Sequence, residues 1–278
     1  MLSGITLQEY EAFKLFLEQA CGIVLGDGKQ YLVSSRLTKL LKAEGIGSLS
    51  ELMTLLSSRQ LSSANLRESV IDAMTTNETS WFRDTAPFAC LDKAVFPELA
   101  ERGNRRYRIW SSACSSGQEP YTISITLSEY LGSMTNKKID LEITATDIST
   151  AILEEAKKAE YEESVLGRGL SAERKNKFFI EKPDGLRQVA NEVKHRIRFK
   201  EQNLLESYAS LGKFDIIFCR NVLIYFSAER KSDILNRMAQ SLNSGGYLFL
   251  GASETITGYS DAFEMTRSPQ GVFYRLKS

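Results

Sequence analysis

The fold is decided by residues 107–121, which read YRIWSSACSSGQEPY. An apolar strand, expected over residues 107–110, leads into a turn of Ser, Ala, Cys and Gly, and a helix is expected to begin near Glu119. Small residues after a strand let the backbone approach a ligand closely, and the start of a helix presents free N–H groups. The stretch therefore predicts a ligand site where a strand meets a helix.

A second strand, expected over residues 141–146, ends in Asp147 and is followed by another helix. In nucleotide-binding α/β folds, a carboxylate at the tip of the second strand holds the ribose hydroxyls. The alternative is that Asp147 is only a residue at the start of a helix, beside Ser149. Together the two strand ends predict a site for a cofactor that contains a nucleoside.

The type of cofactor follows from the motifs that are missing. The turn holds one glycine, Gly117, so the dinucleotide pattern G-x-G-x-x-G is absent, and no Gly-Lys-Ser/Thr follows an expected strand. Without these phosphate-binding devices, a nucleoside with an uncharged or cationic substituent remains, and S-adenosylmethionine is the common one. Glu119 would suit its amino group or sulfonium, although an acid in the first helical turn also complements the helix dipole.

A third part of the site follows the strand expected over residues 214–218. Because ligands bind at the carboxyl ends of strands in open α/β sheets, we expect Arg220, Asn221 and Tyr225 to face the pocket. Nucleic-acid amino-methyltransferases often carry Asn/Asp-Pro-Pro-Tyr/Phe here to grip a flipped base. This chain reads RNVL at residues 220–223, which argues against base methylation without excluding it.

The chain divides into an all-helical part and an α/β part. Residues 1–75 are expected to form a small helical domain, which begins with a capping box made by Thr6 and Glu9. Its second helix, over residues 31–44, places basic side chains opposite an apolar stripe, namely Arg36, Lys39 and Lys42. Residues 76–104 are expected to form a linker and the first helix of the catalytic domain.

From residue 105 to residue 278, strands and helices alternate, which predicts a Rossmann-like α/β domain with a parallel sheet. Further strands are expected over residues 197–200 and 247–250, with Gly245 and Gly246 ending the helix between the strands at 214–218 and 247–250. A hairpin over residues 263–276 closes the sheet. Residues 160–196 are too long for a plain connection and predict an inserted subdomain with a short β-hairpin.

Composition narrows the class of protein further. The formal net charge is zero, which gives no general attraction to nucleic acid. One histidine and four cysteines without CxxC spacing argue against a structural or catalytic zinc site, and we expect no bound metal. No apolar run is long enough to span a membrane and no signal peptide is evident, so we expect a cytoplasmic protein that does not insert into membranes.

These residues together closely resemble the chemotaxis receptor methyltransferases of the CheR family. The match is carried, in order, by blocks at residues 75–84, 110–121, 146–149, 214–226 and 245–254. The resemblance implies methyl esterification, dependent on S-adenosylmethionine, of glutamate side chains on the cytoplasmic helices of chemoreceptors. S-adenosylhomocysteine would be the product.

The resemblance also implies roles for individual residues. Cofactor contacts are implied at Asn77, Thr79, Arg83, Glu119, Asp147, Asn203, Leu204, Arg220 and Asn221. Arg83 and Tyr225 correspond to positions that orient the methyl group and the acceptor carboxylate, and Arg36, Lys39 and Lys42 to a receptor-docking surface. The inserted hairpin resembles a subdomain that binds a receptor's C-terminal tail in some members, but its tight connection at residues 180–185 argues against tail binding.

Two other functions remain open at this point. A nucleic-acid methyltransferase is disfavoured by the neutral charge and the missing proline motif, and a non-catalytic receptor-binding adaptor is disfavoured by the intact set of cofactor residues. The single histidine, His195, is not needed for catalysis. A glutamate acceptor is already ionised at neutral pH and requires no general base.

Overall fold

The computed structural model describes residues 4–58, 61–103, 106–133 and 139–277. Its N-terminal part consists of four helices, which are α1 (Leu7–Cys21), α2 (Gln30–Ala43), α3 (Leu49–Ser57) and α4 (Leu61–Met74). The expected capping box starts α1, because Thr6 and Glu9 each accept a hydrogen bond from the other's backbone N–H. Apolar side chains from all four helices form one core, which includes Phe13, Leu37, Leu52 and Val70.

The rest of the chain is built on a seven-stranded sheet in the order β6-β2-β1-β7-β8-β10-β9. Five neighbouring strands run parallel. β10 runs antiparallel to its neighbour β8, and β9 pairs antiparallel with β10 to form the expected closing hairpin. The strands are β1 (Arg106–Ser112), β2 (Asp140–Asp147), β6 (Ile197–Glu201), β7 (Phe214–Cys219), β8 (Leu242–Leu250), β9 (Phe263–Ser268) and β10 (Gly271–Leu276).

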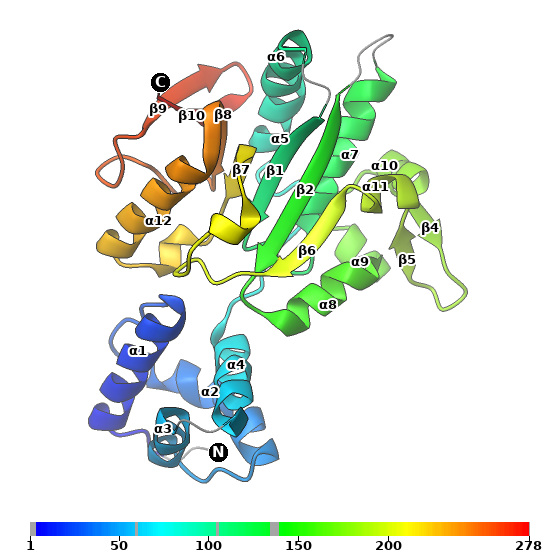
Figure 1. Ribbon diagram of the computed structural model, residues 1–278. Coiled ribbons are helices and arrows are strands. Elements are labelled where there is room, and N and C mark those ends of the chain that lie inside the picture. Colours follow the sequence, from blue (N-terminus) through cyan, green and yellow to red (C-terminus); the bar gives the residue numbers. More distant parts are fainter. Residues whose placement is uncertain (1–3, 59–60, 104–105, 134–138, 278) are drawn as a thin grey trace.

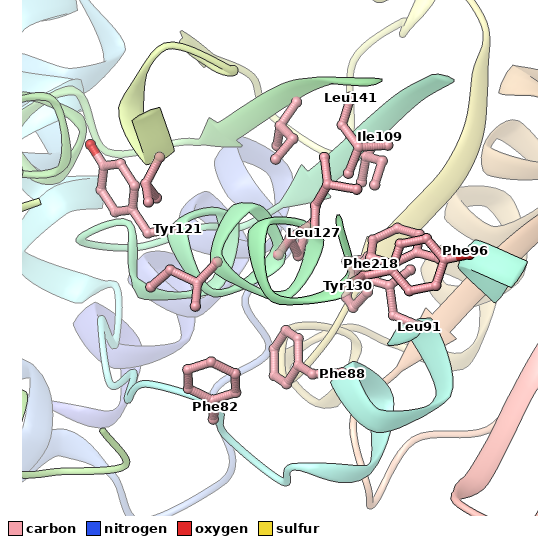
Figure 2. Packing of buried hydrophobic residues seen from close by; sticks show 14 of the residues in the cluster. Phe82, Phe88, Leu91, Phe96, Ile109, Tyr121, Leu127, Tyr130, Leu141 and Phe218 are labelled. Carbon is pink, nitrogen blue, oxygen red and sulfur yellow. The ribbon is translucent and has the colours of Figure 1, made fainter. Parts of the chain in front are cut away.

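Helices cover both faces of this sheet. Alternate residues of a strand point to opposite faces, so Ile109 of β1 joins one core and its neighbour Trp110 joins the other. The first core lies between the sheet and the helical segments at residues 86–101 and 118–132, and Figure 2 shows Phe88, Leu91 and Tyr130 from these segments. The helices on the two faces are α5 (Ala86–Cys90), α6 (Phe96–Glu101), α7 (Gln118–Gly132), α8 (Thr150–Lys158) and α12 (Ala228–Ser241), with a π-helical turn over Leu91–Val95.

The expected insertion lies between α8 and β6. It contains a second, three-stranded sheet in the order β3-β5-β4, whose last two strands are the expected hairpin. Its elements are β3 (Glu160–Tyr161), α9 (Glu163–Leu166), α10 (Ala172–Phe178), β4 (Phe179–Glu181), β5 (Arg187–Val189) and α11 (Asn191–Lys194).

The expected helix stop at Gly245 and Gly246 is wrong. Helix α12 ends at Ser241 and β8 begins at once with Leu242. Phe214 pairs with Leu242 but Ile216 pairs with Tyr247, so β8 bulges between the two pairs and both glycines lie within the bulge. The buried Leu242 side chain and its pairing with β7 outweigh the local preference of glycine for a helix end.

The helical domain lies against one end of the sheet. In Figure 1, the arrows of β1, β2 and β6 point toward α1–α4, so the carboxyl ends of the parallel strands face the helical domain. Across the described part of the chain, none of the helices is both long and apolar enough to cross a membrane.

Candidate active site

A cavity of about 300 Å³ lies between the helical domain and the carboxyl ends of the strands. It opens where β1 and β7 lie side by side, which is the point at which the order of the parallel strands reverses and where ligands bind in open α/β sheets. Its lining includes every residue predicted to bind cofactor or to act in transfer, namely Asn77, Thr79, Arg83, Glu119, Asp147, Asn203, Leu204, Arg220, Asn221 and Tyr225.

Asp147 lies at the end of β2, as expected, and its carboxylate is held by backbone. It accepts hydrogen bonds from the N–H of Ser115 at 2.8 Å and of Ser149 at 3.1 Å. Burial raises the pKa of Asp147, while these backbone hydrogen bonds oppose that rise. The carboxylate is thus fixed at the cavity wall, with lone pairs left for hydroxyl donors.

Glu119 lies in the first turn of α7 and is paired within the protein. Its carboxylate accepts hydrogen bonds from Ser111 Oγ at 2.7 Å and from Arg220 Nη1 at 2.9 Å. Burial raises the pKa of Glu119, and the charge of Arg220 opposes that rise. The side chain of Glu119 is 13% exposed, so it still reaches the cavity.

Arg220 ties the end of β7 to the segment between the two domains. Its Nη2 donates to the carbonyl oxygen of Arg83 at 2.6 Å and to Asp84 Oδ2 at 2.8 Å. The side chain is 1% exposed, and Nε is buried without a hydrogen-bond partner. These contacts give Arg220 a structural role, because they hold Glu119 and residues 83–84 together.

The segment from Thr75 to Asp84 forms one wall of the cavity. The Arg36 guanidinium donates to the carbonyl oxygens of Met74 and Thr75 and to Thr76 Oγ1, and Ser115 Oγ donates to the carbonyl oxygen of Asn77. Arg83 Nη1 donates to the carbonyl oxygen of Glu78 at 2.8 Å. The segment is therefore attached to both domains.

Trp81 anchors the same segment from behind. Its ring packs among Tyr121, Tyr161 and Phe179 with centroid distances of 5.0–6.4 Å. A Cβ at Gly169 would lie 1.9 Å from the Trp81 carbonyl oxygen, so this position has no room for a larger residue. The inserted subdomain thus helps to fix the position of Trp81 and Phe82, the two residues before Arg83.

Backbone conformations that are unfavourable for L residues gather around the cavity. Among the described residues, seven that are not glycine have a positive φ. Three of them, Ala113, Ser115 and Asn221, line the cavity. Three more, Phe82, Asp84 and Thr85, lie within two residues of Arg83, which also lines it. Such strain persists where the surrounding structure determines it, and it is common at functional sites.

The loop that follows β7 carries Asn221 and Tyr225, and it is held by Glu254, a residue for which the sequence motifs predict no role. Glu254 accepts hydrogen bonds from the backbone N–H groups of Asn221, Val222 and Leu223. Glu254 lies in the last block of the family resemblance. It is more than thirty residues from the loop in sequence, so local spacing does not predict the contact.

The helical domain contacts the sheet beside this loop. The N–H of Val24 donates to the Tyr225 carbonyl oxygen at 2.9 Å, and Asn203 Nδ2 donates to the carbonyl oxygen of Ala20 at 2.8 Å. Gly22 ends α1 at φ +79°, and a Cβ there would lie 2.3 Å from the Phe226 ring. On this side the cavity is therefore bordered by a close-packed seam between the helical domain and the sheet.

The three predicted docking residues separate into two groups. Lys39 and Lys42 are exposed on α2. Arg36 lines the cavity, and its guanidinium group donates hydrogen bonds to residues 74–76 within the protein. The docking role stays a prediction for all three, and Arg36 has a structural role besides.

The residues present fit S-adenosylmethionine. Two carboxylates, Asp147 and Glu119, offer acceptors for a ribose diol and for a cationic group, and the small residues Ala113 and Ser115 line the turn between them. Leu204 and other apolar side chains offer a surface for a base. No group of three or more metal-ligating side chains was found within the residues that the structure describes.

Comparisons with known proteins agree with this geometry. The family described as CheR methyltransferase, all-alpha domain, matches residues 8–75, and CheR methyltransferase, SAM binding domain, matches residues 77–272. Chemotaxis protein methyltransferase 1 of Pseudomonas aeruginosa is 52% identical over 97% of this chain and 98% of its own length. Chemotaxis protein methyltransferase of Vibrio parahaemolyticus is 52% identical over 99% of this chain and all of its own, and that of Salmonella typhimurium is 37% identical over 89% and 83%.

Proposed function

Because the chain belongs to the CheR methyltransferase family, we propose that its cavity binds S-adenosylmethionine and that methyl transfer to a receptor glutamate occurs between Arg83 and Tyr225. The chain is an S-adenosylmethionine-dependent methyltransferase of chemoreceptors, a protein-glutamate O-methyltransferase. The observation that carries the residue assignments is the single cavity that brings the carboxylates of Asp147 and Glu119 together with Arg83 and Tyr225.

The cofactor side of the cavity is assigned to residues of the sheet. When bound, S-adenosylmethionine supplies a methyl group attached to a positively charged sulfur atom. In the proposal, Asp147 accepts the ribose hydroxyls and the Glu119 carboxylate lies near the cationic part. Arg220 keeps Glu119 in place from within the protein.

The acceptor side is assigned to the segment between the domains and to the loop after β7. Arg83 and Tyr225 orient the acceptor carboxylate, which needs no base because a glutamate is already ionised at neutral pH. Correct orientation in a bound complex supplies up to about 7–11 kcal/mol in well-aligned systems. The seam between the domains limits water, which favours a step in which opposite charges neutralise each other.

We propose that the receptor reaches the cavity along α2. Lys39 and Lys42 are exposed on this helix and would attract an acidic stretch of the cytoplasmic helices of a receptor. The partner region is inferred from this charge pattern and from the names of the relatives.

The experiment is methyl transfer with tritiated S-adenosylmethionine and membranes that contain a chemoreceptor. We expect label on the receptor that is released as methanol by mild base, because base hydrolyses a methyl ester but not an N-methyl group. Label on added DNA or RNA, or base-stable label on the receptor, would contradict the proposal. Receptor binding without label would favour an adaptor.

A further inference from the structure

Glu254, which follows β8, binds four backbone N–H groups with one carboxylate. Its Oε2 accepts from Asn221 at 2.7 Å and from Gly251 at 2.7 Å, and its Oε1 accepts from Val222 at 2.9 Å and from Leu223 at 2.8 Å. Three of these four donors belong to consecutive residues at the start of the loop after β7. Hydrogen bonds to an ionised acceptor are the strong ones in proteins.

This loop combines an unfavourable backbone conformation with two side chains that line the cavity. Asn221 has φ +58°, a left-handed conformation that side chains other than glycine adopt at a cost. Asn221 and Tyr225 both line the cavity, and the Tyr225 carbonyl oxygen accepts the hydrogen bond from Val24 of the helical domain. A shift of the loop would therefore change both the acceptor site and the seam between the domains.

The contact between the two segments leaves no free space. A Cβ at Gly251 would lie 2.7 Å from Glu254 Oε2 and 2.8 Å from Asn221 Nδ2. A carboxylate is suited to this place because both of its oxygens accept. A glutamine has only one accepting oxygen, and its amide group would face two N–H donors.

We propose that Glu254 is a positioning residue for methyl transfer, which fixes the loop from Asn221 to Tyr225 so that Tyr225 is set against the acceptor carboxylate. The inference rests on the proposed function. It predicts that the geometry of transfer depends on Glu254, while cofactor binding through Asp147 and Glu119 does not.

The test compares Glu254→Gln with Asp215→Asn in the full chain. Asp215 lies near the opposite end of β7 and also accepts a backbone N–H, that of Arg108 at 2.8 Å, so its substitution makes the same chemical change away from the cavity. We expect Glu254→Gln to lower kcat about ten-fold or more per folded molecule. KM for S-adenosylmethionine should change less, by about three-fold, because Asn221 is the predicted cofactor contact that Glu254 holds, while Asp147 and Glu119 keep their own partners. Asp215→Asn should leave kcat within about two-fold.

Equal kcat for the two variants, with an active wild type, would overturn the positioning role and leave the proposed function standing. A wild type that transfers no methyl group would overturn both. If Glu254→Gln does not fold, Gly251→Ala replaces it, because the added methyl group would push the carboxylate and Asn221 apart, and the same loss of kcat is expected.

Hydrogen exchange gives a second readout that does not depend on activity. In wild type, the amides of Asn221, Val222 and Leu223 should exchange slowly, and Glu254→Gln should speed their exchange while the amides of β1 remain protected. Unchanged exchange at these three amides would contradict the proposal.

Discussion

Arg220 and Glu119 form a buried ion pair with an Nη1–Oε2 distance of 2.9 Å. Arg220 also binds Asp84, so that one guanidinium joins the first turn of α7 to the segment between the domains. The cofactor wall and the acceptor wall of the cavity are thus linked through a side chain that is 1% exposed.

Substitution of Arg220 should therefore lower stability strongly. We expect Arg220→Ala to reduce the free energy of unfolding by about 3–5 kcal/mol, because Glu119 is left charged and buried without its partner. Urea denaturation measures the change. Arg106→Ala, which removes a pair with Glu142 at a 63% exposed arginine, should change it by about 1 kcal/mol or less. If the two variants lose equal free energy of unfolding, the buried ion pair stabilises the fold no more than the exposed one does.

Asp147 should be needed for cofactor binding. Asp147→Ala is expected to abolish binding of S-adenosylmethionine in calorimetry, since the ribose hydroxyls lose their acceptor. The control is Glu142→Gln, which lies on the same strand near its other end and outside the cavity lining. Unchanged affinity in Asp147→Ala would refute the ribose assignment.

Cofactor affinity should fall as the solution is acidified. Burial raises the pKa of Asp147 above its ordinary value of 3.8 and raises the pKa of Glu119 above 4.5. Each carboxyl therefore takes up a proton at a higher pH than an exposed one, and affinity is lost as the pH falls through those raised values. Calorimetry at a series of pH values checks this. Affinity that stays constant down to the ordinary carboxyl range would contradict it.

Arg83 and Tyr225 should affect turnover more than binding. We expect Arg83→Ala and Tyr225→Phe to bind S-adenosylmethionine within a few-fold of wild type and to lose most of kcat, because both orient the acceptor. Tyr259→Phe, outside the cavity lining, serves as the control and should keep its activity. Equal losses of binding and turnover in the first two variants would contradict the assigned roles.

Patterns that depend on neighbouring residues predicted most of this molecule. The capping box of Thr6 and Glu9, the strand expected over residues 107–110 within β1 and the strand expected over residues 141–146 within β2 all follow from short stretches of sequence. The alternation of these elements was enough to predict the parallel sheet, and the position of its strand ends predicted that Asp147, Glu119, Arg220, Asn221 and Tyr225 face one pocket. The other predicted residues of the cavity were implied only by the family resemblance, and they are Asn77, Thr79, Arg83, Asn203 and Leu204.

Contacts between distant segments were not predictable in the same way. The basic face of α2 was assigned to docking, yet Arg36 turns to the carbonyl oxygens of residues 74–75, almost forty positions away. The contacts of Glu254 are also long-range, and nothing in its local sequence indicates that residues 221–223 lie beside it. Such contacts are set by packing of the whole domain.

The exposed lysines of α2 should govern receptor recognition. Charge reversal at Lys39 and Lys42 is expected to raise KM for receptor membranes with little change in kcat, and added salt should weaken methylation by wild type in the same sense. Arg36→Ala should differ, because it also releases residues 74–76 and is expected to lower the thermal midpoint. A reaction that does not respond to salt would count against docking through α2.

Stability at low pH should depend on Glu98, far from the cavity. Hydrogen bonds from Arg275, and then from Arg102, lower the pKa of Glu98 from 4.5 to about 2, and the pair ties α6 to the closing hairpin. A carboxyl with a lowered pKa stabilises the folded state above its unfolded pKa and loses that contribution as the pH falls through the folded pKa. We expect Glu98→Gln to reduce the free energy of unfolding by about 1–2 kcal/mol at pH 7, since solvent screens a partly exposed pair.

Urea denaturation at a series of pH values checks this. The difference in the free energy of unfolding between wild type and Glu98→Gln should shrink between pH 4.5 and about pH 2. The control is Glu155→Gln, on the exposed side of α8, which should differ little from wild type at pH 7 or at low pH. A gap between wild type and Glu98→Gln that keeps its size over this range would mean that the arginines contribute packing, and not charge pairing, to the attachment of the hairpin.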